Sequence, residues 1–413
     1  MNASLSVQIA IVGGGIAGLW LLNRLSREGY DVVLLEREAL GKSQTLASQG
    51  IIHGGLKYAL NGVLSPASSA IADMPARWRR CLAGDDIVDL RGTRILSEHY
   101  YMWSGGSARS RLKTFLGSKA LQGRIDALPV DQYPAFFRSA DSGKSRIKGT
   151  LYQLSDFVVD TPSLLHTLAA PFADRIFQCE DIQLQAHDQL VLRREQNTIT
   201  LQASRIILCA GEGNEALLTQ WQAPAGIEKP AMQRRPLQMV SVRVAHPAPP
   251  YLHCIGDSFG MTPRLTITAH PCGDSDADST TDWIWYLGGE LAESGVKRAP
   301  AEQQIAAEKE LKSLFPWIDF SSAHWHSFFV NRAEPRVADL QRPDNAWVAE
   351  CGNILVCWPT KLTLSPNLGD RVHTLLQDLK PLRSSEAQSA TQSLAQLLPK
   401  ATLAHAPWES QRG

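Results

Sequence analysis

The chain reads Val7-Gln8-Ile9-Ala10-Ile11-Val12-Gly13-Gly14-Gly15-Ile16-Ala17-Gly18 close to its amino terminus. The first six of these residues form an apolar run typical of a buried parallel strand, and Gly13, Gly15 and Gly18 then satisfy the pattern G-x-G-x-x-G. Leucines at helical spacing predict a helix over residues 19–28, and residues 31–36 predict a second strand that ends in an acid. This order of strand, glycine loop, helix and strand is typical of a dinucleotide-binding unit.

Each glycine of this loop has its own role in such a unit. Gly13 permits the tight turn, Gly15 lets the backbone approach a pyrophosphate, and Gly18 lets the helix pack closely on the strand. The helix amino terminus offers N–H groups and the positive end of its dipole to the phosphates. Glu36 lies 18 residues after Gly18, near the spacing of about 20 expected for a carboxylate that holds ribose hydroxyls. The alternative is a glycine-rich turn with Glu36 as a solvated strand end.

The composition of the chain excludes several other classes of function. The 413 residues include 41 basic and 41 acidic side chains, without a charged block, which argues against nucleic acid as a main partner. The seven cysteines form no C-x-x-C pair, so we expect neither a disulfide framework nor a zinc site, and we predict no metal. The sequence shows no signal peptide and no apolar stretch of about 20 residues. We therefore expect a soluble, cytoplasmic protein without a transmembrane segment, for which peripheral membrane contact stays open.

Two later segments also predict contacts with a dinucleotide. Residues 205–211 read as an apolar strand that ends at Gly211, and no acid-tipped strand follows, so we assign them to the first cofactor site and not to a second nucleotide domain. Residues 353–358 read as another strand, and Pro366 opens a helix over 367–376. The amino terminus of that helix could stabilise the negative charge that a reduced flavin develops. An ordinary strand–loop–helix is the alternative for this last segment.

Taken together, these segments resemble the D-amino-acid oxidase superfamily of FAD-dependent oxidoreductases. This family includes glycine and sarcosine oxidases, glycerol-3-phosphate dehydrogenase and L-2-hydroxyglutarate dehydrogenase. The stretch A-S-Q-G-I-I-H-G-G-L-K-Y at residues 47–58 is similar to the second flavin motif of the family, and its HGGLKY portion is closest to the glycerol-3-phosphate dehydrogenase form. The match is looser at Trp358-Pro359-Thr360-Lys361, where the family usually has glycine-rich sequence. The resemblance implies FAD, not NAD, as the cofactor.

The fold class that this resemblance implies is α/β, with a Rossmann-like FAD-binding domain of the glutathione-reductase type and an interleaved antiparallel-sheet substrate domain. Alternating residues over 240–244, 264–268 and 283–287 predict strands of the antiparallel sheet, and residues 301–315 predict a helix that covers it. We expect the FAD-binding domain to comprise residues 1–90, 145–235 and 325–413. The substrate domain is then expected at residues 91–144 and 236–324.

A flavin accepts a hydride from a C–H bond next to an amine or hydroxyl, so the protein must orient the substrate and handle one proton. His53 could act as the base, shape the flavin edge or carry a covalent flavin bond, the alternative being a histidine bonded to the backbone. Lys361 could stabilise an anionic reduced flavin, the alternative being a surface lysine. Arg332, Arg336 and Arg264 are candidates for binding a substrate carboxylate or phosphate, and internal ion pairs are the alternative for the first two.

These expectations define three groups of site residues. The predicted catalytic residues are His53, Lys361 and Arg332, and the predicted substrate-binding residues are Arg264, Arg332 and Arg336. The predicted cofactor-binding residues are Gly13, Gly15, Ile16, Ala17, Gly18, Glu36, Arg37, Ser48, Gln49, Gly50, His53, Gly54, Gly211, Lys361 and Leu362.

The predicted activity is that of an FAD-dependent oxidoreductase acting on a small amino acid, 2-hydroxy acid or polyol phosphate. The HGGLKY portion favours a hydroxy substrate. The electron acceptor is left open among oxygen, a quinone and a partner flavoprotein. Two alternatives stay beside this prediction: a flavoprotein whose FAD is structural and which serves as a binding subunit of a larger complex, and a dehydrogenase that uses NAD alone.

Overall fold

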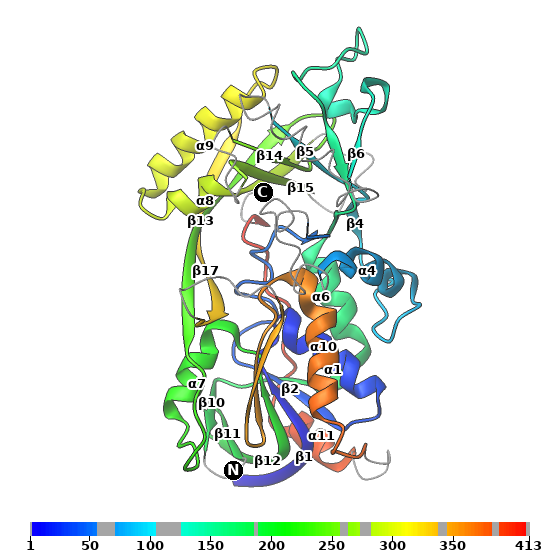
Figure 1. Cartoon of the computed structure of the whole chain (residues 1–413). Helices are drawn as coiled ribbons and strands as arrows, with labels where there is room; N and C mark the ends of the chain where they lie inside the picture. Colours follow the sequence, from blue (N-terminus) through cyan, green and yellow to red (C-terminus); the bar gives the residue numbers. More distant parts are fainter. Residues whose placement is uncertain are drawn as a thin grey trace.

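The computed structural model describes residues 2–55, 71–104, 125–185, 189–256, 263–272, 282–337, 345–381 and 388–409. Residues 56–58 of the predicted second flavin motif lie outside these ranges. The molecule is elongated, with one sheet at each end (Figure 1).

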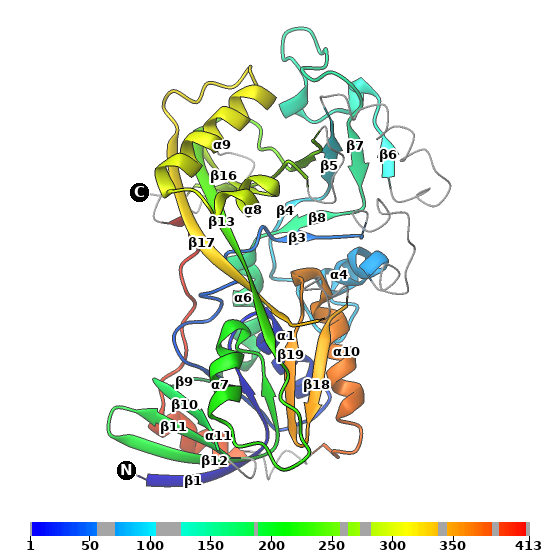
Figure 2. The same ribbon diagram turned by 60° about the vertical axis from the view of Figure 1, so that its left-hand side comes forward.

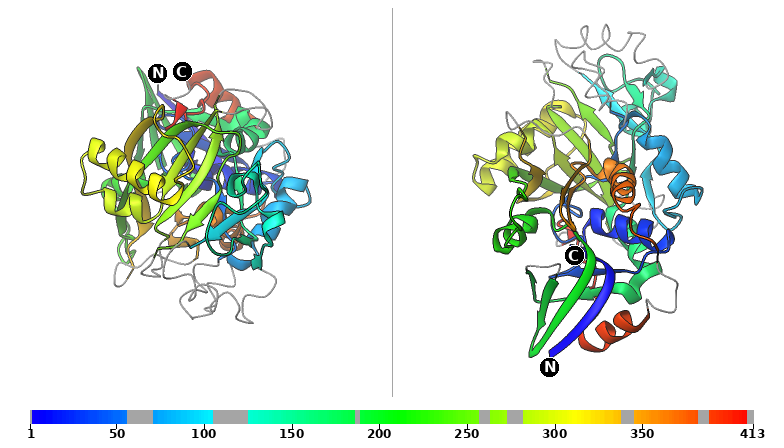
Figure 3. Two further views of the ribbon diagram at one scale, coloured as in Figure 1. Left: turned by 90° about the horizontal axis from the view of Figure 1, so that it is seen from above. Right: turned by 60° about the horizontal axis from the view of Figure 1, so that its bottom comes forward.

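The first sheet has eight strands and lies at the end that carries the amino terminus (Figure 1). Its parallel strands run in the order β9 (Ile176–Gln178), β2 (Val32–Glu36), β1 (Asn2–Val12), β12 (Asn197–Leu208) and β19 (Ile354–Trp358). Its antiparallel strands are β10 (Asp181–Leu184), β11 (Gln189–Arg194) and β18 (Trp347–Cys351). Seen from below, β1 and β12 run side by side with α11 (Gln388–Leu397) next to them (Figure 3). Parallel pairing of β1 with β12 puts residues 205–208 in the same sheet as the strand that leads into the glycine loop.

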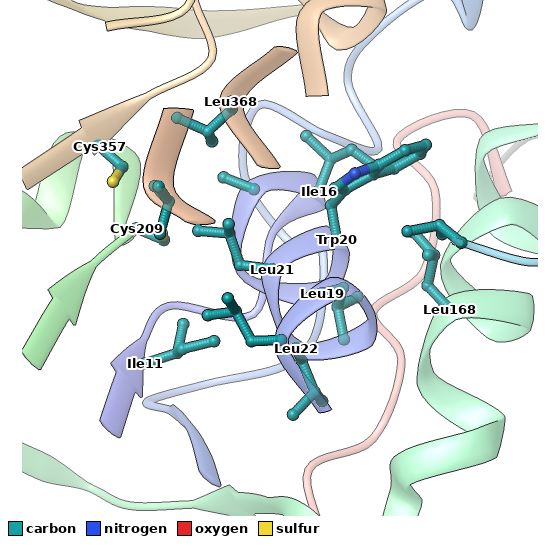
Figure 4. Close-up of a cluster of buried hydrophobic side chains, with 14 of the residues drawn as sticks. Ile11, Ile16, Leu19, Trp20, Leu21, Leu22, Leu168, Cys209, Cys357 and Leu368 are labelled. Carbon is teal, nitrogen blue, oxygen red and sulfur yellow. The ribbon is translucent and has the colours of Figure 1, made fainter. Parts of the chain in front are cut away.

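Apolar side chains cover both faces of this sheet, as expected for parallel strands. On β1, Ile9 and Ile11 join one core cluster while Ala10 and Val12 join another, because successive side chains point to opposite faces. The first cluster contains α1 (Ile16–Arg27), whose leucines and Trp20 pack toward Leu168 and Leu368 (Figure 4). It also includes buried side chains from three further helices, α4 (Met74–Ala83), α6 (Thr161–Ala169) and α10 (Ser365–Leu375). The second cluster includes α7 (Asn214–Gln220) and α11.

The second sheet also has eight strands, which lie at the other end of the molecule. Their order is β17 (His324–Pro335), β13 (Met232–Ala245), β16 (Asp282–Gly288), β15 (Leu265–Pro271), β14 (Leu252–Cys254), β5 (Tyr100–Trp103), β7 (Tyr152–Leu154) and β6 (Ile125–Ala127). Two helices, α8 (Glu290–Gly295) and α9 (Pro300–Leu314), pack on one face of it. The long strands β13 and β17 reach from this sheet toward the first one (Figure 2). The predicted antiparallel strands and covering helix are confirmed.

A small third sheet of β3 (Ile51–Ile52), β8 (Phe157–Val159) and β4 (Ile95–Ser97) lies between the two large ones (Figure 2). Short 3-10 turns complete the fold at Val130–Gln132, Ala135–Phe137, Ala170–Arg175, Gly211–Gly213 and Leu362–Leu364. In the part of the chain that the structure describes, no helix combines the length and the apolar character that crossing a bilayer requires.

The mixed α/β fold class is confirmed, but the sheet boundaries differ from the expected domain boundaries. Residues 152–154 were expected in the FAD-binding domain, yet β7 pairs with β5 and β6 of the second sheet. Residues 325–335 were expected there too, yet β17 pairs with β13 over twelve residues. The backbone hydrogen bonds of both segments, which local sequence does not encode, decide the sheet to which they belong.

The chain after α11 crosses from the first sheet to the second. Its backbone forms bridges at Phe177–Lys400 and Leu40–Leu403 on the way. Trp408 is fully buried on the second sheet, with its ring 4.0 Å from that of His270 and 5.0 Å from that of Tyr286. This carboxy-terminal segment therefore ties the two sheets together.

Candidate active site

A cavity of about 810 Å³ lies between the two large sheets. Val12, Glu36, Cys209 and Trp358 line it, so the carboxyl ends of β1, β2, β12 and β19 all open into it. This is the edge at which open α/β sheets bind their ligands. The opposite wall comes from the second sheet and includes His253 and Arg332.

The glycine loop forms one end of this cavity. Gly13 has a φ of +109°, and a Cβ on it would lie 2.6 Å from the Ala210 backbone, so no other residue fits. A Cβ on Gly15 would stand 3.1 Å from Thr45 Oγ1. Gly18 does not line the cavity, but a Cβ there would lie 1.9 Å from the Gly13 carbonyl oxygen. Gly18 thus acts through the close packing of helix and loop rather than by facing a ligand.

Glu36 is held in a fixed position beside this loop. Its Oε2 accepts a hydrogen bond of 2.6 Å from the Gly14 N–H, and its Oε1 accepts bonds from the N–H groups of Arg37 and Glu38 at 2.8 and 2.9 Å. The carboxylate lines the cavity where a ribose hydroxyl pair would lie beside the loop. Thr45, which the sequence did not single out, accepts a 3.0 Å bond from the Ile16 N–H and fixes the start of α1.

Residues 44–53, the crossing segment, lie between the two sheets and are held to the second one by hydrogen bonds. Gln49 Nε2 donates to the carbonyl oxygens of Thr266 and Tyr286 at 3.2 and 2.9 Å, and Tyr286 Oη donates to Ala47 O at 2.8 Å. Gly50 has a φ of +68°, and a Cβ on it would lie 2.1 Å from Val159 O. Ser48, Gln49 and Gly50 all line the cavity, as predicted. Gly54 does not, but its N–H donates a 2.7 Å hydrogen bond to Asp156 Oδ1.

His53 belongs to a cluster of three titratable side chains at this end of the cavity. Its Nδ1 lies 3.1 Å from Asp156 Oδ2, and the side chain of Asp156 is only 4% exposed. The ring of His253 is nearly parallel to that of His53, with centroids 6.0 Å apart, and its Nδ1 lies 3.0 Å from Thr266 Oγ1. Asp156 and His253 could not be found from the sequence, since each is at least 100 residues from His53 and no local motif marks either.

Ligand atoms of His53, Asp156 and His253 lie within 4.8 Å of one another, which is close enough to suit a metal ion. The sequence predicts no metal, and this cluster is the place in the described residues where an added ion would test that prediction. The contacts of His53 with Asp156 and of His253 with Thr266 also give the cluster a role without metal, namely holding and moving a proton.

Residues 359–362, which follow β19, line the cavity between the glycine loop and His53. Lys361 and Leu362 line it, and Lys361 is 9% exposed, so the alternative of a surface lysine is wrong. Thr363 Oγ1 accepts a 2.8 Å bond from the His53 N–H, which joins this segment to the crossing segment. Thr360 has a φ of +63°, a backbone conformation that favours glycine. Thr360 therefore adopts a conformation that favours glycine, at a place where the D-amino-acid oxidase superfamily usually has glycine-rich sequence.

The three candidate arginines lie in different surroundings. Arg332 lines the cavity, and its Nη2 donates to Glu293 Oε1 at 3.3 Å. Arg264 does not line it; its Nη2 donates to Glu310 Oε2 of α9 at 2.7 Å. Arg336 is exposed and outside the cavity, with its N–H bonded to Ala231 O. Of the three predicted substrate-binding arginines, Arg332 therefore lines the cavity while Arg264 and Arg336 do not. Sequence spacing does not show which way these side chains face.

An FAD molecule fits these residues. The cradle at Gly13 and Gly15 would be filled by any Cβ, Glu36 is oriented beside it, and the cavity continues from there to His53 and Lys361. The cavity is therefore long enough to pass from a pyrophosphate loop to a reaction centre between the two sheets.

Comparison with known proteins supports the same assignment. The family model described as "DAO: FAD dependent oxidoreductase" matches residues 8–353. The probable FAD-dependent oxidoreductase PA4991 of Pseudomonas aeruginosa is 45% identical over 410 residues, which cover 99% of each chain. The crystal structure of PA4991 matches all of both chains with a TM-score of 0.79 at 41% identity.

More distant solved structures share the fold. Glycine oxidase from Geobacillus kaustophilus is 17% identical with a TM-score of 0.63, over 91% of this chain and 96% of that one. L-alpha-glycerophosphate oxidase from Mycoplasma pneumoniae, with FAD bound, is 14% identical with a TM-score of 0.62, over 91% and 95%. The chain therefore belongs to the DAO family of FAD-dependent oxidoreductases and is an enzyme whose cofactor is FAD.

Proposed function

We propose that this enzyme oxidises a carbon that carries a hydroxyl group in a small substrate such as a 2-hydroxy acid or polyol phosphate. The observation behind this proposal is the pair formed by His53 and the buried Asp156, 3.1 Å apart, at the edge of the cavity. When bound, FAD accepts the hydride from the substrate carbon. The chain itself must then take the proton of the hydroxyl.

The need for a base separates hydroxyl substrates from amines. An alkylammonium group has a pKa near that of lysine, about 10, and reaches its neutral form without much help. An alcohol is about as weakly acidic as water, whose pKa is about 15.7, so its proton must be removed as the hydride leaves. We assign the His53 Nδ1–H to the contact with Asp156, which leaves Nε2 as the basic nitrogen, as a buried carboxylate does for a catalytic imidazole.

Two cationic side chains that line the cavity are assigned to stabilise negative charge on the cofactor and on the substrate. We propose that Lys361, buried at the start of the Leu362–Leu364 turn, stabilises the negative charge on the reduced cofactor. We assign Arg332, on the opposite wall, to the anionic group of the substrate. The predicted cofactor contacts at Ile16, Ala17, Arg37, Gly211 and Leu362 also line the cavity and are kept in this proposal.

The proposal is tested by anaerobic mixing of the yellow holoenzyme with hydroxy acids, polyol phosphates and the matching amino acids. Bleaching of the flavin by hydroxy compounds is expected. In His53→Ala the rate of bleaching should fall about 100- to 10,000-fold, the usual contribution of a general base. His405→Ala is the matched control, because His405 is 94% exposed and pairs with Glu409 away from the cavity.

An unchanged reductive half-reaction in His53→Ala would overturn the role of His53. Bleaching by amino acids alone would overturn the preference for a hydroxyl. If no small molecule bleaches the flavin, the second candidate, a binding subunit with structural FAD, gains the support that the enzyme proposal loses.

We further propose that the enzyme works in the cytoplasm with oxygen, a quinone or a flavoprotein as the electron acceptor. All seven cysteines are free, which suits a reducing compartment. Stopped-flow reoxidation of the reduced enzyme by oxygen and by a soluble quinone separates an oxidase from a dehydrogenase. A rate with oxygen far below that with the quinone would exclude the oxidase.

A further inference from the structure

The wall of the cavity that comes from the second sheet is mostly apolar. The side chains that line it include Met102, Leu154, Leu237, Met239, Ile255 and Val330. The polar residues on the same wall are His253, which stacks on His53, and Arg332. The opposite wall carries the glycine loop and Lys361, which we assign to FAD. Among the residues that the structure describes, a substrate between the cofactor and the second sheet therefore meets an apolar surface whose guanidinium is that of Arg332.

The sheet register shows that part of this surface is continuous. Leu237 of β13 lies directly opposite Val330 of β17, and Met239 follows two residues further on the same face. Arg332 follows Val330 by two residues and shares its face. Arg235 lies directly opposite Arg332 on β13, but it does not line the cavity and its guanidinium lies 3.5 Å from Glu334 and 4.0 Å from Glu293. The guanidinium of Arg332 therefore stands at the end of an apolar patch formed by Leu237, Met239 and Val330.

A substrate with two negative charges does not suit this wall. A phosphate dianion or a second carboxylate needs several N–H donors, and a charge placed against leucine and methionine loses its hydration without compensation. In the described part of the wall the guanidinium is that of Arg332, which Glu293 already contacts at 3.3 Å. Arg264, the residue before β15, donates to Glu310 outside the cavity.

We infer that the substrate is a 2-hydroxy monocarboxylic acid with an aliphatic side chain, and that Leu237, Met239 and Val330 determine this specificity. The inference rests on the proposed oxidation of a hydroxyl. The carboxylate pairs with Arg332, and the aliphatic chain packs on the apolar patch. The proton of the hydroxyl passes to His53 as the C2–H hydride goes to FAD, so the product is the corresponding 2-oxo acid.

The test compares five probes in anaerobic stopped-flow reduction of the holoenzyme: the two enantiomers of 2-hydroxy-4-methylpentanoate, and 2-hydroxyglutarate, glycerol 3-phosphate and leucine. The ratio of limiting reduction rate to dissociation constant should be at least tenfold higher for one enantiomer of 2-hydroxy-4-methylpentanoate than for 2-hydroxyglutarate or glycerol 3-phosphate. Binding is measured separately from the change in the flavin spectrum on titration with the unreactive acids 4-methylpentanoate and glutarate. 4-Methylpentanoate should bind at least tenfold more tightly.

The outcomes separate this inference from the proposed function. Faster reduction by glycerol 3-phosphate or 2-hydroxyglutarate overturns the inference and leaves hydroxyl oxidation standing. Reduction by leucine and not by the hydroxy acids overturns hydroxyl oxidation, while tighter binding of 4-methylpentanoate still supports the apolar monocarboxylate site. Equal or weaker binding of 4-methylpentanoate overturns the inference even if none of the probes reduces the flavin.

A charge placed on the patch supplies a second test. Val330→Arg should lower the ratio for 2-hydroxy-4-methylpentanoate at least tenfold and narrow its advantage over 2-hydroxyglutarate. Phe329→Arg is the matched control, because Phe329 is the next residue on β17, is 56% exposed and does not line the cavity. Leu237→Lys repeats the test from β13 if Val330→Arg fails to retain FAD. An unaltered preference in a folded, FAD-loaded variant contradicts the role of the patch.

Discussion

The glycine loop leaves no room for an added Cβ atom, and Gly18 is the clearest case. A Cβ on Gly18 would lie 1.9 Å from the Gly13 carbonyl oxygen, so helix α1 and the loop would have to separate. We expect Gly18→Ala to lose most of its FAD and to melt at a lower temperature. The measurements are the ratio of flavin to protein absorbance and a thermal melt. Gly226→Ala is the control, since φ is +85° but no atom lies within 4 Å of the added Cβ.

For that control we expect a loss of about 1 kcal/mol from backbone strain alone, with FAD retained. Full FAD occupancy and an unchanged melting temperature in Gly18→Ala would show that the loop can shift, and that the close packing at Gly18 is not essential.

Lys361 gives a second prediction at the scale of the residue. Its buried cation lines the cavity, and a charge-assisted interaction of about 1.5–3 kcal/mol with reduced FAD corresponds to about 30–60 mV for a two-electron couple. Lys361→Met should therefore make the midpoint potential of the bound FAD more negative by about that amount. Lys42→Met is the control, because Lys42 also lines the cavity but is 60% exposed and pairs with Glu38. Spectral titration against reference dyes measures both, and equal potentials in the two variants would exclude the role of Lys361.

At the scale of the element, the carboxy-terminal segment holds the two sheets together through Trp408. Its ring is fully buried against His270 and Tyr286, and Tyr286 Oη donates to Ala47 of the crossing segment. Trp408→Ala should lower the free energy of unfolding by about 3–5 kcal/mol, as other buried large-to-small changes do. Because Tyr286 also anchors residues that line the cavity, the variant should bind FAD more weakly.

Trp408→Phe keeps most of the packing and is the control for that variant. Chemical denaturation gives the free energy of unfolding, and titration of the apoprotein with FAD gives the affinity. A loss of stability without any loss of FAD affinity would show that the segment supports the second sheet alone.

The elements also show which features the sequence could predict. The strand, glycine loop, helix and acid of residues 7–36 are encoded locally, by apolar periodicity and by glycines at fixed spacing, and all four were predicted. The sequence did not show in which sheet β7 and β17 would pair, because contacts between distant segments decide this. Thr360 at a φ of +63° was not predicted either, since a threonine gives no sign of such a conformation.

The site at the scale of the whole molecule could be predicted only in part for the same reason. His53 was found because it stands in a stretch that resembles a flavin motif. Asp156 is the residue before β8 and His253 lies on β14, and only the tertiary fold brings them to His53. Arg264 and Arg332 look alike in sequence, yet one faces α9 and the other the cavity, and the direction of each side chain depends on strand register.

The cysteines report on the integrity of the whole molecule, because they are distributed over its separate cores. Cys81, Cys209 and Cys357 lie in the α1 cluster, Cys179 and Cys351 in the cluster on the other face of the first sheet, and Cys254 in the core of the second sheet. All six are buried, and Cys272 is half-buried. Burial raises the pKa of the Cys81 and Cys179 thiols to about 12, so hardly any reactive thiolate forms at pH 8.

We therefore expect one fast-reacting thiol, that of Cys272, when the folded holoenzyme meets a disulfide reagent such as DTNB at pH 8. The other six should react only in denaturant, because each must first be exposed by unfolding of the core that contains it. Cys272→Ser should abolish the fast phase and leave the total after unfolding at six. Two or more fast thiols in the native protein would mean that at least one core opens readily. A Cys→Ser variant that removes the extra fast phase would then identify which core opens.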